Sequence, residues 1–236
     1  MRKFLGLVIG AALLATPAFA DADHRLEESG KVLQEIIAMP DGVPQDLLKK
    51  AECVVVLPSV KKVAIGFGGS YGKGAMSCRS GEHFNGPWSA PVMMALEGGS
   101  WGLQLGGSST DIILLLMNPH AADSLLNNEV KLGVDASAAA GPKGRMAEAS
   151  TDAAMKAEIL SYSRSRGLFA GISLNGARLH ADNDANEKIY GKEINAKKII
   201  TRAGNNSELM VSELNKISPY DKSDRESLDN AHRDKK

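Results

Sequence analysis

Apolar residues along this chain follow two periodicities, first that of a helix and then that of strands. In residues 21–51 they recur at helical spacing, and the Met-Pro-Asp-Gly sequence at 39–42 separates a long helix from a short second one. From residue 53 onward the pattern changes to short apolar runs rich in β-branched residues, each ended by Gly, Pro or Ser. Strands are predicted at 53–57, 63–67, 71–78, 88–96, 101–105, 111–117, 130–139, 158–164, 168–174 and 177–181.

The strands do not alternate with long helices, which argues against a doubly wound parallel sheet. After residue 53, short helices are predicted only at 119–128, from about 182 to 190, and at 207–217. We therefore predict an α+β fold, an antiparallel β-rich sandwich or partly closed barrel with flanking short helices. Gly-rich turns are expected to close one hairpin at 68–70 and another at Asn175-Gly176.

The predicted organisation is a leader, one domain and a tail. Residues 1–20 have a basic start, an apolar run and the small-residue site Ala18-Phe19-Ala20, which predicts a signal peptide cleaved after Ala20. An N-terminal membrane anchor is the alternative, but the run is shorter than the about 20 residues that cross a bilayer. Residues 21–217 are predicted to form a single domain, with 21–51 as its helical segment. Residues 218–236 are charged and are predicted to be a flexible tail.

The leader, the cysteines and the charge limit which cell compartment and which kinds of partner are expected. The leader predicts a periplasmic or secreted protein of a bacterium, and an oxidising compartment favours a disulfide between its two cysteines, Cys53 and Cys78. Two buried, unbonded thiols are the alternative. The 28 basic and 28 acidic residues balance, so the chain lacks the net positive charge of a dedicated nucleic-acid binder.

Three motifs suggest enzyme or metal chemistry, and each fails in detail. The segment 66–74 lacks the Gly spacing and the Ser or Thr of a phosphate-binding loop. Residues 98–102 match G-x-S-x-G around Ser100, but a strand pattern follows where a nucleophile elbow needs a helix. Residues 182–187 begin like a calcium loop but lack its Gly and its bidentate Glu, so a helix cap is the simpler interpretation. We therefore predict no catalytic residues, no metal site and no cofactor.

Basic residues in loops and at strand ends are the better candidates for binding. Loops that join antiparallel strands converge at the ends of a sandwich, where such charges could attract phosphate head groups. The candidates are Lys61, Lys62, Lys73, Lys143 and Arg145. The first helix offers an apolar face that could enter a membrane surface or pack on the domain. That face consists of Leu26, Val32, Leu33, Ile36 and Ile37.

Four blocks of sequence resemble the SYLF domain, also called the actin-binding domain of yeast cortical-patch proteins. They are CVVVLPSVKKVAIGFGGSYGKGAMSCR (53–79), WSAPVMMALEGGSWGLQLGGSSTDIILLLMN (88–118), KLGVDASAAAGPKGR (131–145), and SYSRSRGLFAGISLNGA (161–177) followed by NEKIYG (186–191). The resemblance extends over about residues 30–205. It implies binding to membrane lipids, and in some members to actin filaments, through basic residues and an N-terminal amphipathic helix.

A bacterial envelope changes which of these ligands is expected. It offers anionic phospholipids such as phosphatidylglycerol, whereas actin is unlikely there. The sequence therefore predicts a non-enzymatic lipid-binding protein that uses a basic patch plus an amphipathic helix to bind anionic head groups. The alternative is an envelope scaffolding protein that binds a protein partner.

Overall fold

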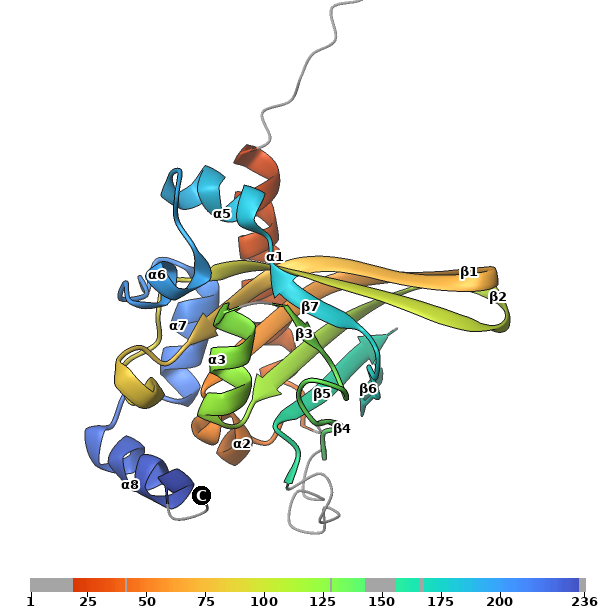
Figure 1. The fold of residues 1–236 in the computed structure, drawn as a ribbon. Coiled ribbons are helices and arrows are strands. Elements are labelled where there is room, and N and C mark those ends of the chain that lie inside the picture. Colours follow the sequence, from red (N-terminus) through yellow and green to blue (C-terminus); the bar gives the residue numbers. More distant parts are fainter. Residues whose placement is uncertain (1–18, 41, 128, 143–155, 166–167, 234–236) are drawn as a thin grey trace, which may run out of the picture.

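The computed structural model describes residues 19–40, 42–127, 129–142, 156–165 and 168–233 (Figure 1). Its helices are α1 (Phe19–Ile37), α2 (Gln45–Lys50), α3 (Pro119–Asn127), α5 (Asn183–Tyr190), α6 (Ala196–Ile200), α7 (Leu209–Ile217) and α8 (Lys222–Arg233), with one short 3-10 turn, η1 (Glu82–Phe84). Its strands are β1 (Cys53–Cys78), β2 (Val92–Leu116), β3 (Val130–Lys131), β4 (Ala138–Ala140), β5 (Ile159–Ser165), β6 (Leu168–Gly171) and β7 (Arg178–Ala181).

Two long strands dominate the sheet that the described residues form. β1 and β2 pair antiparallel along almost their whole length, from Cys53 opposite Leu116 to Met76 opposite Val92. β7 pairs with the first part of β2 and carries β3 at its other edge, while β5 pairs with the last part of β2. β5 also pairs with β6 and, in the only parallel pair among the described strands, with β4. The predicted α+β fold with a mainly antiparallel, partly closed sheet is confirmed.

β1 folds back so that its two halves lie against each other. The Cα atoms of Cys53 and Cys78 are 4.0 Å apart, and a disulfide joins the two residues, as predicted. A Cβ atom at Gly74 would lie 2.0 Å from the Val56 carbonyl oxygen, and one at Gly72 would lie 2.5 Å from a methyl carbon of Val60. Only glycine at these two positions permits so close an approach between the halves of β1.

The folded-back part of the strands is covered on both faces. All five residues from Cys53 to Leu57 are fully buried, although neighbouring strand residues point to opposite faces. One core lies inside the curled sheet and includes Leu57, Met94 and Leu114. A second core lies between the sheet and the helices α1, α2 and α7. Among the described residues, no helix combines the length and the apolar composition that crossing a bilayer requires.

Four details of the sequence prediction are wrong. Residues 68–70 were expected to form the turn of a hairpin, but they lie inside the continuous strand β1 and pair with residues 98–100 of β2. The segment 218–236 was expected to be a flexible tail, but residues 222–233 form α8, which is held by the buried Arg225. Gly176 makes the expected turn with a φ of 84°, yet β6 and β7 pair with other strands and not with each other. The predicted strand at 130–139 is reduced to β3 and β4, separated by a turn at Gly133 with a φ of 75°.

Replacing Gly74 with Ala should destabilise the fold by about 3 kcal/mol, because the added methyl group would push against the Val56 backbone and separate the halves of β1. Urea unfolding followed by circular dichroism measures the loss. Gly99→Ala on β2 is the matched control, since nothing lies within 4 Å of its added Cβ atom. Equal stability of the two variants would mean that the halves of β1 are not held this closely.

Candidate functional site

The outer part of the β1/β2 ribbon is exposed on both of its faces. Beyond the contact between Val60 and Gly72, no described residue of β1 is buried, from Lys61 on one half to Tyr71 on the other. We call residues 61–71 of β1 and 97–109 of β2 the arm. It projects away from the helices to the right in Figure 1, and each of its described side chains is at least partly exposed.

Two of the predicted binding residues lie on the arm. Lys61 and Lys62 are exposed and pair with the exposed Ser109 and Ser108 of β2. Because consecutive strand residues point to opposite faces, exposure of both lysines shows that no second layer covers this part of the ribbon. Tyr71, which is 49% exposed, adds an aromatic side chain at the base of the same arm.

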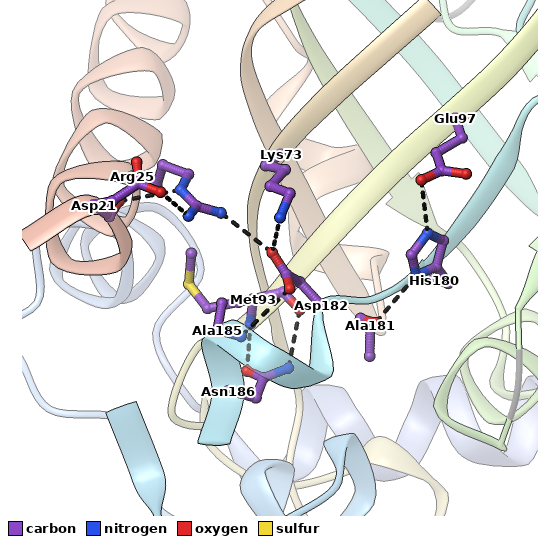
Figure 2. A network of polar contacts seen from close by, with 10 residues as sticks. All are labelled: Asp21, Arg25, Lys73, Met93, Glu97, His180, Ala181, Asp182, Ala185 and Asn186. Atoms are coloured by element: carbon purple, nitrogen blue, oxygen red, sulfur yellow. Dashed lines mark hydrogen bonds and ion pairs between the residues drawn. The ribbon is translucent and has the colours of Figure 1, made fainter. Parts of the chain in front are cut away.

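Lys73 lies elsewhere and has a structural partner, so it does not join the arm lysines as a free cation. Its Nζ atom is 2.7 Å from the carboxylate of Asp182, which is only 8% exposed. Arg25 of α1 donates to the same carboxylate at 3.2 Å (Figure 2). In the structure Lys73 neutralises a buried charge, and its role in lipid binding stays a prediction.

Asp182 connects three parts of the fold. Its side chain accepts a hydrogen bond from the Ala185 backbone and so caps α5, as the sequence predicted in place of a calcium loop. Burial raises the pKa of Asp182, but the hydrogen bond and charge of Lys73, with smaller contributions from Ala185 and Arg25, outweigh it and lower the pKa. The carboxyl group is therefore ionised at neutral pH and holds α1, β1 and α5 together.

The apolar face of α1 is part of the second core. Val32, Leu33 and Ile36 are 6% exposed or less, and Leu26 and Ile37 pack beside them. They contact the sheet and α7, which burial in a membrane would require them to leave. In the structure this face packs on the domain, so entering a membrane would require α1 to separate from the sheet, and its role at a membrane stays a prediction.

Two further candidates, Lys143 and Arg145, lie outside the described residues, and their role stays a prediction. Ser100 lies inside β2, paired with Gly68, and so is not on the strand-to-helix turn of a nucleophile elbow. No group of three or more His, Cys, Asp and Glu side chains that could hold a metal ion occurs within the described ranges.

A second polar cluster, which the sequence analysis missed, lies beside the disulfide. Glu52 and Arg79 flank the two cysteines, and Arg225 of α8 forms a buried ion pair with Glu52. Arg79 is 1% exposed and lies 4.1 Å from the centre of the Trp88 ring. The sequence held one signal for this cluster, the predicted disulfide, because pairing the two cysteines brings the neighbouring residues 52 and 79 together.

Arg79 remains a cation despite its burial. Burial, followed by the nearby charge of Arg225, lowers the pKa of Arg79 to about 10, although Glu52 opposes the shift. At neutral pH the cluster therefore holds two guanidinium groups and a single buried carboxylate. Arg79 also lines a cleft of about 420 Å³ between α2, α7 and α8, together with Lys49 and Lys50.

Comparison with known proteins gives one family and several relatives. The family described as Ysc84, Las17-binding protein actin regulator, matches residues 97–217. LAS seventeen-binding protein 3 of Saccharomyces cerevisiae is 35% identical over 162 residues, which cover 67% of this chain and 34% of that protein. The SH3 domain-containing YSC84-like protein 1 of Homo sapiens is 29% identical over 191 residues, 78% of this chain and 55% of that protein. The chain thus spans between about a third and about half of the length of these relatives.

Replacing Asp182 with Asn keeps a capping oxygen but removes the charge between Lys73 and Arg25. We expect a loss of about 2 kcal/mol of unfolding free energy at pH 7. Because the folded-state pKa of Asp182 is lowered, its contribution is full above the ordinary pKa of the group and is lost as the pH falls through the folded value. Urea unfolding should therefore show the stability difference between the two proteins shrinking as the pH falls below the ordinary aspartate pKa of 3.8. The exposed Asp184→Asn is the control, and a gap that is independent of pH would contradict the assignment.

Proposed function

Because the chain belongs to the Ysc84 family, also called the SYLF family, we propose that it is a binding protein without catalytic activity whose ligand is an anionic phospholipid surface. Family membership implies binding to lipid or actin. The observation that carries the choice of lipid is the arm, a glycine-rich ribbon with two exposed, adjacent lysines and no covering layer over its described side chains. We assign the membrane contact to the arm, whereas the sequence analysis assigned it to the first helix.

Two forces support such a contact. Each lysine near an anionic surface contributes about 1 kcal/mol, so Lys61 and Lys62 together supply about 2 kcal/mol. The balanced total charge adds little long-range attraction. Additional affinity must therefore come from burial of uncharged surface, and the exposed Tyr71 ring lies on the arm where an aromatic side chain can enter the interface between head groups and acyl chains.

A protein partner is the second candidate, and the family description favours it because it names Las17 binding and actin regulation. The same exposed ribbon could present backbone and lysine donors to an acidic protein surface. The two candidates differ in what they require: lipid binding needs vesicles with anionic head groups, whereas partner binding does not.

Vesicle binding tests the proposal through a charge-reversal variant. The wild-type chain should sediment with vesicles that contain phosphatidylglycerol and much less with phosphatidylcholine alone. Lys61→Glu/Lys62→Glu should weaken anionic binding by at least about 30-fold at low salt, the equivalent of about 2 kcal/mol. The matched control is Lys197→Glu/Lys198→Glu, another exposed adjacent pair, which should bind as the wild type does.

Failure of the wild-type chain to bind either vesicle would remove lipid as the ligand and leave the protein-partner candidate. Equal binding by the Lys61/Lys62 variant and its control would take the arm lysines out of the contact. Binding that is insensitive to salt would contradict the electrostatic part of the proposal.

We further propose that the mature protein works in the bacterial periplasm or is secreted. The basic start, apolar run and small-residue site within residues 1–20 support this, and so does the Cys53–Cys78 disulfide, which an oxidising compartment favours. Mass spectrometry of the periplasmic fraction should find a chain that begins at Asp21. A full-length chain that starts at Met1 and stays in the cytoplasm would contradict the proposal.

A further inference from the structure

Three buried nitrogen donors in the cluster beside the disulfide have no hydrogen-bond acceptor within the described part of the chain. They are Nε and Nη1 of Arg79 and Nε of Arg225. The remaining Arg79 nitrogen, Nη2, donates to the carbonyl oxygen of Ser218 at 2.8 Å and to its hydroxyl group. Buried donors are almost always paired, because an unpaired one keeps the full cost of losing its water. Such donors on a buried cation indicate a place for an acceptor that carries negative charge.

The buried carboxylate of the cluster, that of Glu52, already has an ion-pair partner. Glu52 forms its ion pair with Arg225, whose Nη2 also donates to the Phe84 carbonyl oxygen at 2.6 Å. Arg79 lines the cleft between α2, α7 and α8, and among the described residues its guanidinium group has only Ser218 as a hydrogen-bond partner. The second positive charge of the cluster therefore has no carboxylate of its own among its hydrogen-bond partners.

The walls of the cleft suit a small anion with several oxygen atoms. The exposed Lys49 and Lys50 stand at its α2 side, and the hydroxyl groups of Ser218 and Ser227 line it. Three aspartates also line the cleft: Asp46, Asp221 and Asp224. The Asp221 carboxylate already accepts hydrogen bonds from Ser223 at 2.8 Å and 2.7 Å, and Asp46 and Asp224 are exposed to water, which screens their repulsion.

We propose that this cleft binds a phosphate monoester, with Arg79 at its floor as the main donor and with Lys49 and Lys50 at its entrance. A phosphate monoester carries up to two negative charges and three terminal oxygens, so it can accept from Arg79 and from a lysine at once. The phosphate could belong to a lipid head group or to a soluble molecule. The cleft lies at α2 and α8, away from the arm (Figure 1), so binding at the two places succeeds or fails independently.

Isothermal titration calorimetry with inorganic phosphate, glycerol 3-phosphate and water-soluble dihexanoyl phosphatidic acid tests this site. Saturable binding of one or more of these probes at millimolar concentrations is expected. Binding of all three indicates a soluble phosphate as the ligand, and binding of the lipid alone indicates a head group. A matched change in Trp88 emission should accompany binding, because Arg79 stacks on that ring.

Arg79→Gln should weaken binding by at least about tenfold, since it removes a charge-assisted hydrogen bond. Lys49→Gln/Lys50→Gln leaves the buried cluster intact and should weaken binding several-fold, while Lys197→Gln/Lys198→Gln should not. If Arg79→Gln does not fold, the Lys49/Lys50 variant decides. The proposal is overturned if no probe binds the wild type, if folded Arg79→Gln binds as tightly as the wild type, or if the Lys49/Lys50 variant keeps full affinity when it is the deciding one.

Discussion

The close contact between the two halves of β1 determines the rest of this structure. Gly72 and Gly74 let the backbone approach Val60 and Val56, and the disulfide closes the same contact at its base. Below this point the strands are buried on both faces and carry two cores. Above it they continue as an arm that water surrounds. One contact therefore separates the part of the sheet that stabilises the protein from the part that is free to bind.

The fold could be predicted from the sequence where local pattern decides it. The apolar run that begins at Cys53 and the short helices α3 and α7 follow from periodicity. The disulfide follows from the presence of two cysteines and a predicted oxidising compartment. α8 could not be predicted, because its charged sequence resembles a solvated tail and its anchor, Arg225, pairs with a residue 173 positions away. The Asn175-Gly176 turn was identified, but a turn fixes where the chain bends and not which strands then pair.

The candidate binding residues likewise include some whose surroundings local sequence predicts and some whose surroundings it does not. Exposure of Lys61 and Lys62 agrees with their place in a polar, glycine-rich segment of the sequence. The ion pair of Lys73 is formed with Asp182, which is distant in the sequence and which no local pattern identifies. The apolar face of α1 illustrates a general ambiguity, since an amphipathic helix that packs on a domain and one that lies on a membrane have the same periodicity. Tertiary packing alone distinguishes them.

The position of α1 has a consequence for the order in which the molecule is assembled. Its apolar face is completed by α7, and Gln34 of α1 donates a hydrogen bond to Glu213 of α7 at 3.0 Å. A chain is made from its N-terminus, so the final contacts of the first helix form only after a partner 179 positions later in the sequence has been added. The core between α1, α7 and the sheet is therefore completed only after α7 has been made.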